Sequence, residues 1–292
     1  MRLVTYIAGG ARRGGAVVGD SVLDLASASH GRILGPVPSF LSDARLLQEA
    51  RQLIERAATD EDFSARYCRP LSSLQLLSPV PRPGKVLCLG LNYRDHAAES
   101  GAPVPEEPIV FAKASSSVIG PAMPIRLPHC SQKVDYEVEL AVIIGGRAKG
   151  ISAAEAMQYV AGYTVLNDVT ARDYQREKPG GQWTLAKSFD TFCPMGPWIV
   201  TADEIPDPHD LGLSTDLCGE AMQSSRTDQM IFGIPEIIEY ITRVLTLEPG
   251  DVIGTGTPPG VGFARRPPRY LKQGDVVECR VEGIGTLRNP VH

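Results

Sequence analysis

Short alternating runs of apolar and polar residues open the chain and predict strands. Residues 2–7 (RLVTYI) and 16–25 (AVVGDSVLDL) are typical of a small hairpin region, and a Gly-Asp turn interrupts the second run. The pattern then changes, because residues 39–58 carry leucine and isoleucine at helical spacing, with Ser39 or Ser42 available as N-cap. We therefore expect a helix after the first strands.

The remainder of the chain is predicted to consist mostly of short strands separated by Gly and Pro. It follows residues 76–85, where three prolines and a glycine predict a linker. Two more helices are expected. Residues 152–162 open with a capping-box pattern and end at a glycine, and residues 234–251 have Pro235 in the first turn and a Pro-Gly stop.

Three carboxylates alternate with apolar residues in VDYEVEL, residues 134–140. Because side chains alternate across a strand, Asp135, Glu137 and Glu139 would share one face. An ordinary strand with one face in water explains the alternation equally well. The next residues, AVIIGG at 141–146, are continuously apolar, as expected of a strand buried on both faces. Acids at the end of a buried strand need neutralising, and a hard divalent cation suits carboxylate oxygens.

The charge of the chain does not select a macromolecular partner. There are 34 acidic and 29 basic residues, with a net charge of −5, so neither a nucleic-acid surface nor a polybasic membrane anchor is indicated. The six cysteines include no CxxC pair, which favours reduced thiols. No signal-peptide pattern or membrane span is recognised, so we expect a soluble, cytoplasmic protein.

Polar residues that follow other apolar runs are further candidates for chemistry. Asp168 ends an apolar strand in YTVLNDVTARDYQ, residues 163–175, and could add an oxygen ligand beside Glu137 and Glu139. A turn explains Asn-Asp equally well. Lys113 and Lys187 each stand among small residues, and either binds a carboxylate or enolate in the site or is simply solvated.

His96 and Glu99 are candidates for general base catalysis. They would lie three residues apart on a helical turn over residues 92–100, capped by Asn92. A carboxylate beside an imidazole fixes its tautomer and raises its basicity, although a surface pair would have the same spacing. The Gly- and Pro-rich residues 101–108 could allow this turn to open and close as a lid.

The glycine-rich residues 250–262 (GDVIGTGTPPGVG) do not match a dinucleotide-binding motif. The glycine spacing is wrong, and two prolines remove amide donors where a phosphate-binding helix should begin. A backbone-lined pocket wall around Thr257 fits these residues better.

Taken together, six ordered motifs resemble the fumarylacetoacetate hydrolase family over about residues 84–290. They are NY with HAAE, FAK, DYEVE, ND with ARDYQ, KSF and GTGTP. The resemblance implies a mostly β (α+β) fold with a rolled mixed β-sheet core and few helices, plus a small N-terminal α/β region. We expect a small N-terminal domain over 1–75 and a catalytic domain over 76–292. The resemblance also implies a homodimer that binds Mg²⁺ or Mn²⁺, with Ca²⁺ as a further candidate.

The resemblance also implies roles for individual residues, and Asp135 matches its motif without being a clear metal ligand. The implied metal ligands are Glu137, Glu139 and Asp168, the implied catalytic residues are His96, Glu99, Lys187 and Gln175, and the implied substrate-binding residues are Tyr93, Lys113, Arg172 and Thr257.

The implied reaction acts on a small 2-oxo carboxylic acid through a metal-stabilised enolate. The first hypothesis is hydrolysis of a carbon-carbon bond in an acylpyruvate or fumarylpyruvate, with water activated by His96 and Glu99. The alternative is an oxaloacetate decarboxylase or tautomerase, or a related isomerase or hydratase. A metal-binding scaffold without catalytic activity remains a third hypothesis.

Overall fold

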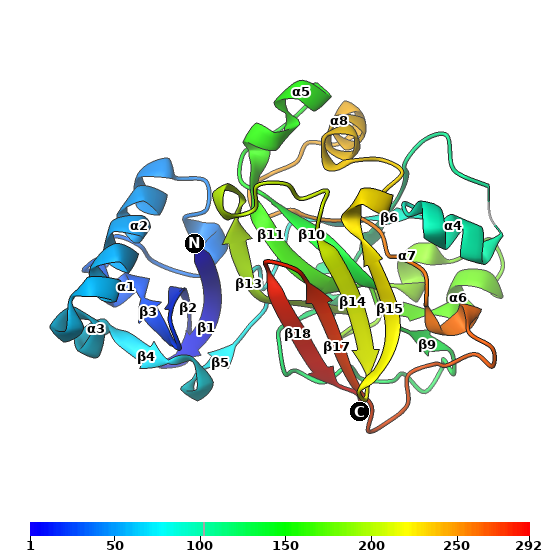
Figure 1. The fold of residues 1–292 in the computed structure, drawn as a ribbon, viewed down its shortest axis with the longest axis horizontal. Coiled ribbons are helices and arrows are strands. Elements are labelled where there is room, and N and C mark those ends of the chain that lie inside the picture. The colour runs from blue at the N-terminus through cyan, green and yellow to red at the C-terminus, as the bar shows by residue number, and fades with distance from the viewer. Residues whose placement is uncertain (102) are drawn as a thin grey trace.

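One mixed sheet of 12 strands runs through the molecule and links its N-terminal elements to the rest (Figure 1). The computed structural model describes residues 1–101 and 103–292. Along the sheet the order is β4 (Cys68–Pro70), β3 (Ser21–Asp24), β2 (Ala11–Val18), β1 (Arg2–Ala8), β13 (Cys193–Thr201), β11 (Val160–Asn167), β10 (Val138–Ile144), β16 (Val252–Gly254), β6 (Val86–Gly90) and β7 (Ile109–Lys113). Two short strands, β5 (Gln75–Leu76) and β8 (Val118–Ile119), pair with β1 and β13. The sheet is mixed because β16 pairs with β6 in parallel.

A second sheet packs against the centre of the first. Its order is β15 (Glu220–Arg226), β14 (Gly212–Leu217), β17 (Val276–Val281) and β18 (Gly285–Pro290), and Figure 1 shows it in front of β10 and β11. Leu140, Val142 and Ile144 belong to the apolar core that contains residues of this second sheet. Ala141 and Ile143 belong to the core shared with the N-terminal elements. Strand β10 is therefore buried on both faces. The large mixed sheet and the small number of helices confirm the predicted fold class.

The acidic stretch forms two strands where one was expected. β9 (Val134–Asp135) pairs with β12 (Thr170–Ala171), and β10 begins only after a break at Tyr136 and Glu137. Every residue from 134 to 144 is buried. The three acids therefore lie inside the protein and do not form a row in water.

Helices cover the ends and edges of the sheets. They are α1 (Leu25–Ala28), α2 (Ala44–Thr59), α3 (Glu61–Tyr67), α4 (Arg94–Ser100), α5 (Ala153–Ala156), α6 (Arg172–Arg176), α7 (Trp183–Ala186) and α8 (Ile234–Val244). The expected helix at 39–58 is α2, and its N-cap is Asp43, whose carboxylate accepts hydrogen bonds from the amides of residues 45 and 46. The predicted cap at Ser39 or Ser42 is wrong, because Val37–Ser39 form a separate 3-10 turn.

Two helices are shorter than their sequence pattern predicted. The capping box between Ser152 and Glu155 is present, but α5 gives way to a 3-10 turn, and β11 begins at Val160. Gly162 does not end a helix. It lies in β11, where a Cβ atom would come within 2.2 Å of the backbone oxygen of Val200, so strand packing requires glycine there. Helix α8 ends at residue 244, before the Pro-Gly turn that was expected to stop it.

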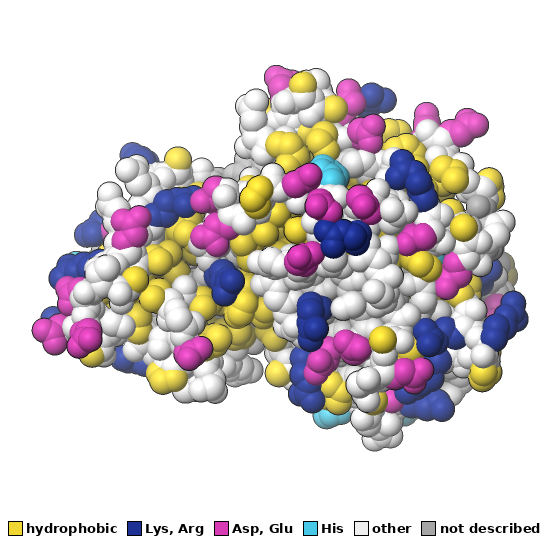
Figure 2. Space-filling view, in the orientation of Figure 1, with side chains coloured by type: hydrophobic (Ala, Val, Ile, Leu, Met, Phe, Trp, Pro, Cys, Tyr) yellow, Lys and Arg dark blue, Asp and Glu magenta, His cyan; other side chains and the backbone are white. Residues whose placement is uncertain are grey.

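The N-terminal elements join the rest through backbone pairing. β1 pairs with β13, with Leu3 opposite Ile199. Figure 2 shows hydrophobic side chains on the surface between the N-terminal elements and the main body. The division into domains at 75/76 stays a prediction.

The sequence analysis recognised no membrane-spanning segment, and the helices of the structure bear on this point. No helix among residues 1–101 and 103–292 is both long enough and apolar enough to cross a membrane. The six cysteines are free thiols.

Candidate active site

Three carboxylates from two neighbouring strands meet in the interior. Antiparallel pairing of β10 with β11 places Val138 opposite Asn167, so Glu137 lies beside Asp168. Two backbone contacts fix this arrangement, because the amide of Asp168 donates to the carbonyl of Glu137 at 2.8 Å and Asn167 Oδ1 accepts from the amide of Glu137 at 3.0 Å. One ligand oxygen from each of Glu137, Glu139 and Asp168 lies within 4.8 Å of the other two.

Glu139 carries the clearest sign of a cation site. Both of its carboxylate oxygens are buried, and neither has a hydrogen-bond partner of good geometry within the described part of the chain, although the nearby Gly256 amide acts to lower its pKa. Burial, Asp168 and Glu137 raise the pKa of Glu139 well above its ordinary value. At Gly254 on β16 a Cβ atom would come within 2.3 Å of Glu139 Oε2, so glycine leaves the room that this carboxylate occupies. A buried, unpaired set of hard oxygen donors fits Mg²⁺, Mn²⁺ or Ca²⁺.

Two buried lysines partly balance the three acids. Lys187, directly after α7, donates to Glu137 Oε2 at 2.9 Å, to Asp168 Oδ2 at 2.5 Å and to Thr170 Oγ1 at 2.8 Å. Burial lowers the pKa of Lys187, but Asp168 and Glu137 outweigh it and raise the pKa, so the amine stays cationic. Lys113, at the end of β7, donates to Asp168 Oδ1 at 2.6 Å.

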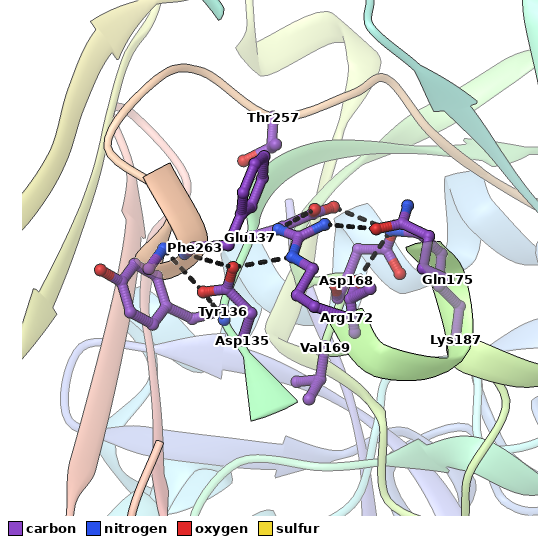
Figure 3. A network of polar contacts seen from close by, with 12 residues as sticks. Asp135, Tyr136, Glu137, Asp168, Val169, Arg172, Gln175, Lys187, Thr257 and Phe263 are labelled. Atoms are coloured by element: carbon purple, nitrogen blue, oxygen red, sulfur yellow. Dashed lines mark hydrogen bonds and ion pairs between the residues drawn. The ribbon is translucent and has the colours of Figure 1, made fainter. Parts of the chain in front are cut away.

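Arg172 links the acids to helix α6 (Figure 3). Its Nε donates to Asp135 Oδ2 at 2.8 Å, its Nη2 lies 2.6 Å from Glu137 Oε1, and its Nη1 donates to Gln175 Oε1 at 2.9 Å. Burial raises the pKa of Glu137, but Lys187 and Arg172 outweigh it and lower this pKa to about 2. Glu137 is therefore ionised at neutral pH.

Asp135 supports the site without joining the three convergent acids. Its carboxylate also accepts from the amides of Gly262 at 2.7 Å and Phe263 at 3.1 Å. A Cβ atom at position 262 would come within 2.5 Å of Asp135 Oδ1, which explains the glycine there. Asp135 thus fixes both Arg172 and the turn that carries Phe263.

The His96 and Glu99 pair forms on α4, close to the glycine-rich loop. His96 Nδ1 lies 3.2 Å from Glu99 Oε2, and Glu99 Oε1 accepts from the amide of Gly260 at 2.9 Å. Burial raises the pKa of Glu99, but the hydrogen bonds from His96 and Gly260 outweigh it, so the net pKa is lowered. An ionised Glu99 can only accept a hydrogen bond, so His96 Nδ1–H donates to it and Nε2 is left as the basic nitrogen of the ring.

The expected cap of this helix is wrong. Tyr93 is the N-cap position of α4, and Asn92 serves another purpose. The Asn92 amide donates to the carbonyl of Thr255 at 2.8 Å and accepts from the amide of Phe232 at 2.9 Å. It therefore joins the start of α4 to the loop after β16. Residue 102, within the predicted lid at 101–108, lies outside the described residues.

Thr257 is positioned by a residue that sequence reasoning missed. Gln223 on β15 donates to Thr257 Oγ1 at 2.8 Å and accepts from the amide of Val138 at 3.0 Å and from Thr215 Oγ1 at 2.8 Å. Gln223 is 1% exposed. Nothing in its strand sequence distinguishes it, because its partners lie far away along the chain.

A cavity of about 280 Å³ opens onto these groups. Of the predicted residues, those that line it are Glu137, His96, Arg172, Gln175, Lys187 and Thr257. Arg176, Trp183 and Phe263 also line it and were not predicted. Tyr93 and Lys113 are 0% and 3% exposed and do not line the cavity, so their predicted contact with substrate stays a prediction.

The comparisons with known proteins agree on one family. A family model described as fumarylacetoacetate (FAA) hydrolase C-terminal matches residues 85–292. Oxaloacetate tautomerase FAHD2A, mitochondrial, of Bos taurus is 53% identical over 222 residues, which cover 76% of this chain and 71% of the relative. A fumarylacetoacetate hydrolase domain-containing protein 2 homolog of Dictyostelium discoideum is 43% identical over 303 residues, covering 100% of this chain and 97% of the relative.

Solved structures give the same fold over the whole chain. A putative HpcE protein from Mycobacterium smegmatis is 39% identical with a TM-score of 0.85, covering 100% of this chain and 99% of that one. Fumarylacetoacetate hydrolase from psychrophilic Exiguobacterium antarcticum is 36% identical with a TM-score of 0.82, also covering 100% and 99%.

One prediction from the sequence requires correction. A cytoplasmic protein was expected because no targeting pattern was recognised. The vertebrate relatives from Xenopus laevis, Bos taurus and Homo sapiens, at 51–53% identity, are named mitochondrial. These names contradict the cytoplasmic assignment, which was inferred only from the lack of a recognised signal.

Proposed function

We propose that this chain, which belongs to the fumarylacetoacetate hydrolase family, is an enzyme that interconverts the enol and keto forms of oxaloacetate. Relatives named oxaloacetate tautomerase are 51–53% identical to it. These names support the oxaloacetate alternative of the sequence analysis better than its first hypothesis of carbon-carbon hydrolysis.

The residues that would hold a divalent cation are Glu137, Glu139 and Asp168. Their fit is supported by the unpaired oxygens of Glu139 and by the hard-oxygen chemistry of the set. A cation bound there would polarise the 2-oxo group as a Lewis acid and stabilise negative charge on its oxygen.

In this proposal Lys187 stabilises the developing charge and His96 transfers the proton. Lys187 remains cationic and lines the cavity, so it stabilises negative charge as the enolate develops. In the keto-to-enol direction His96 Nε2 takes a proton from C3 and then releases it to water, while the enolate oxygen takes a proton from water to give the enol. In the reverse direction the enol oxygen loses its proton to water and His96 returns a proton to C3. Glu99 holds the imidazole in the tautomer that this transfer requires.

The observation that carries the proposal is that a cationic lysine, an imidazole and Glu137, one of the three convergent acids, line one small cavity. Its volume of about 280 Å³ is at the small end of ligand cavities.

The test uses freshly dissolved oxaloacetate with the protein and Mg²⁺ or Mn²⁺. Enol absorbance reports tautomerisation, and coupled assays report pyruvate and carbon dioxide. We expect faster equilibration of enol and keto forms without pyruvate. His96→Asn should suppress this, whereas the matched variant His129→Asn, at an exposed histidine, should not. Equilibration at the uncatalysed rate in the presence of metal would contradict the proposal.

Hydrolysis remains the second candidate because the His96 and Glu99 pair also suits activation of water. Acylpyruvate and fumarylpyruvate distinguish it, since hydrolysis yields pyruvate and a second carboxylic acid. Pyruvate with carbon dioxide from oxaloacetate would instead indicate decarboxylation. A scaffold without catalytic activity predicts no turnover of any of these acids and no effect of His96→Asn.

We also propose that the protein is a homodimer. The proposal rests on the resemblance of the sequence motifs to a family whose members are usually dimeric. Light scattering tests this, and a monomer at micromolar concentration would contradict it.

A further inference from the structure

Arg176 is a cavity residue whose charge the site chemistry above does not use. It ends helix α6, four residues after Arg172, and lines the cavity. Its guanidinium carbon lies 4.6 Å from the centre of the Phe263 ring, and that of Arg172 lies 4.5 Å from the same ring. Phe263 thus holds two guanidinium groups at the same wall of the cavity.

The two arginines differ in how their charge is balanced. Arg172 is buried and paired with Asp135 and Glu137. Arg176 is exposed, and no carboxylate oxygen of the described residues lies within 4.0 Å of it. The charge of Arg172 is therefore balanced inside the protein, whereas the charge of Arg176 is available to an anion in the cavity.

The pairing of the cavity-lining cations suggests where an anionic group would bind. Lys187 and Arg172 line the cavity, and both are already paired with Glu137. Arg176 also lines the cavity and has no carboxylate partner among the described residues. It is therefore the cation that a further carboxylate of the substrate would meet.

We propose that Arg176 is a specificity-determining residue that binds the distal carboxylate of a four-carbon dicarboxylic acid. The assignment rests on the proposed function, because it takes the 2-oxo end of the substrate to lie toward Glu137 and Lys187. A guanidinium presents a planar pair of donors to a carboxylate, and stacking on Phe263 limits the orientations that the side chain adopts. Acids that end in a methyl group would leave this charge without a partner.

Equilibrium binding tests the assignment without turnover. Calorimetry with Mg²⁺ present compares each enantiomer of malate with 2-hydroxybutyrate, which has a methyl group in place of the distal carboxylate. The variants are Arg176→Gln and the matched control Lys178→Gln. Lys178 is an exposed neighbour that contacts the Tyr174 ring and does not line the cavity.

The wild type and Lys178→Gln should bind one enantiomer of malate more tightly than 2-hydroxybutyrate, by about tenfold or more. Arg176→Gln should remove this preference and leave the affinity for 2-hydroxybutyrate unchanged. In turnover, Arg176→Gln should raise KM for oxaloacetate but not for its 4-methyl ester, with kcat nearly constant.

Three results would overturn the assignment: no malate preference in the wild type, a preference that survives Arg176→Gln, or an equal loss in Lys178→Gln. Failure of the proposed function is a different result. It would leave oxaloacetate unchanged by the wild type while the malate preference still depended on Arg176.

Discussion

Glu139 Oε2 lies where the Cβ atom of any larger residue at position 254 would be. A Cβ atom there would lie 2.3 Å from this oxygen and 2.9 Å from Cys88 Sγ. The glycine on β16 and the carboxylate on β10 are therefore matched across two paired strands. Replacing Gly254 with alanine would therefore displace the Glu139 carboxylate, although the replacement adds no charge.

Gly254→Ala should weaken Mn²⁺ binding by about tenfold or more, because supporting contacts of this kind commonly have that effect on metal affinity. It should also lower the free energy of unfolding by about 1–3 kcal/mol, the usual cost of overpacking. Gly146→Ala is the control, since its Cβ would meet only the Tyr159 ring at 3.2 Å. Mn²⁺ titration and urea unfolding measure both effects. Equal Mn²⁺ affinities for the two variants would contradict this interpretation.

Glu139→Gln should stabilise the metal-free protein at neutral pH. The pKa of Glu139 is raised, so the folded state retains a proton that the unfolded state releases. Stability from this group is present below the ordinary pKa of about 4.5 and is lost as pH rises toward the raised value. In the presence of EDTA, the Tm of the variant should therefore fall less than the Tm of the wild type as the pH rises from about 5 to about 8. The same fall in Tm with rising pH in both proteins would refute this prediction.

Lys113→Met should destabilise the protein by about 3 kcal/mol, at the low end for breaking a buried ion pair. The Lys113 and Asp168 side chains are both 0% exposed, and Lys187 still contacts Asp168 in the variant. The matched control is Lys133→Met, which breaks an exposed pair with Glu177 and should cost about 0–1 kcal/mol. Urea unfolding in EDTA measures the free energy of unfolding of both variants. Similar losses would contradict the prediction that the buried ion pair contributes more to stability than the exposed one.

Gln223→Met should raise KM more than it lowers kcat, because it releases the Thr257 hydroxyl without touching the acids. It also leaves the amide of Val138 unpaired, at a cost of about 1–3 kcal/mol in stability. Gln229→Met, at a residue that bonds Asp228 on the surface, is the control and should change neither. A pure loss of stability with KM unchanged would show that Gln223 has only a structural role.

The convergence of the three acids could be predicted from the sequence because these residues follow strand periodicity. Glu137 and Glu139 are two residues apart in a buried apolar run, and Asp168 directly follows the neighbouring strand β11. The motifs of the resembling family placed these segments in one site. The pattern did not predict the break before β10, because pairing of β9 with β12 decides it.

Other features depend on contacts between distant segments, which no local pattern contains. Asn92 is a good helix cap by residue type, but it bonds Thr255 and Phe232 instead. Gln223 and Arg176 lie in unremarkable polar stretches. Their significance appears only when the glycine-rich loop and Phe263 fold against them.

The central claim is that Glu137, Glu139 and Asp168 bind one divalent cation, and anomalous diffraction from crystals soaked in Mn²⁺ tests it most directly. The account predicts one strong anomalous peak with an oxygen of each carboxylate within about 2.0–2.6 Å. A map with no peak between these three side chains, or with the peak elsewhere in the cavity, would contradict it.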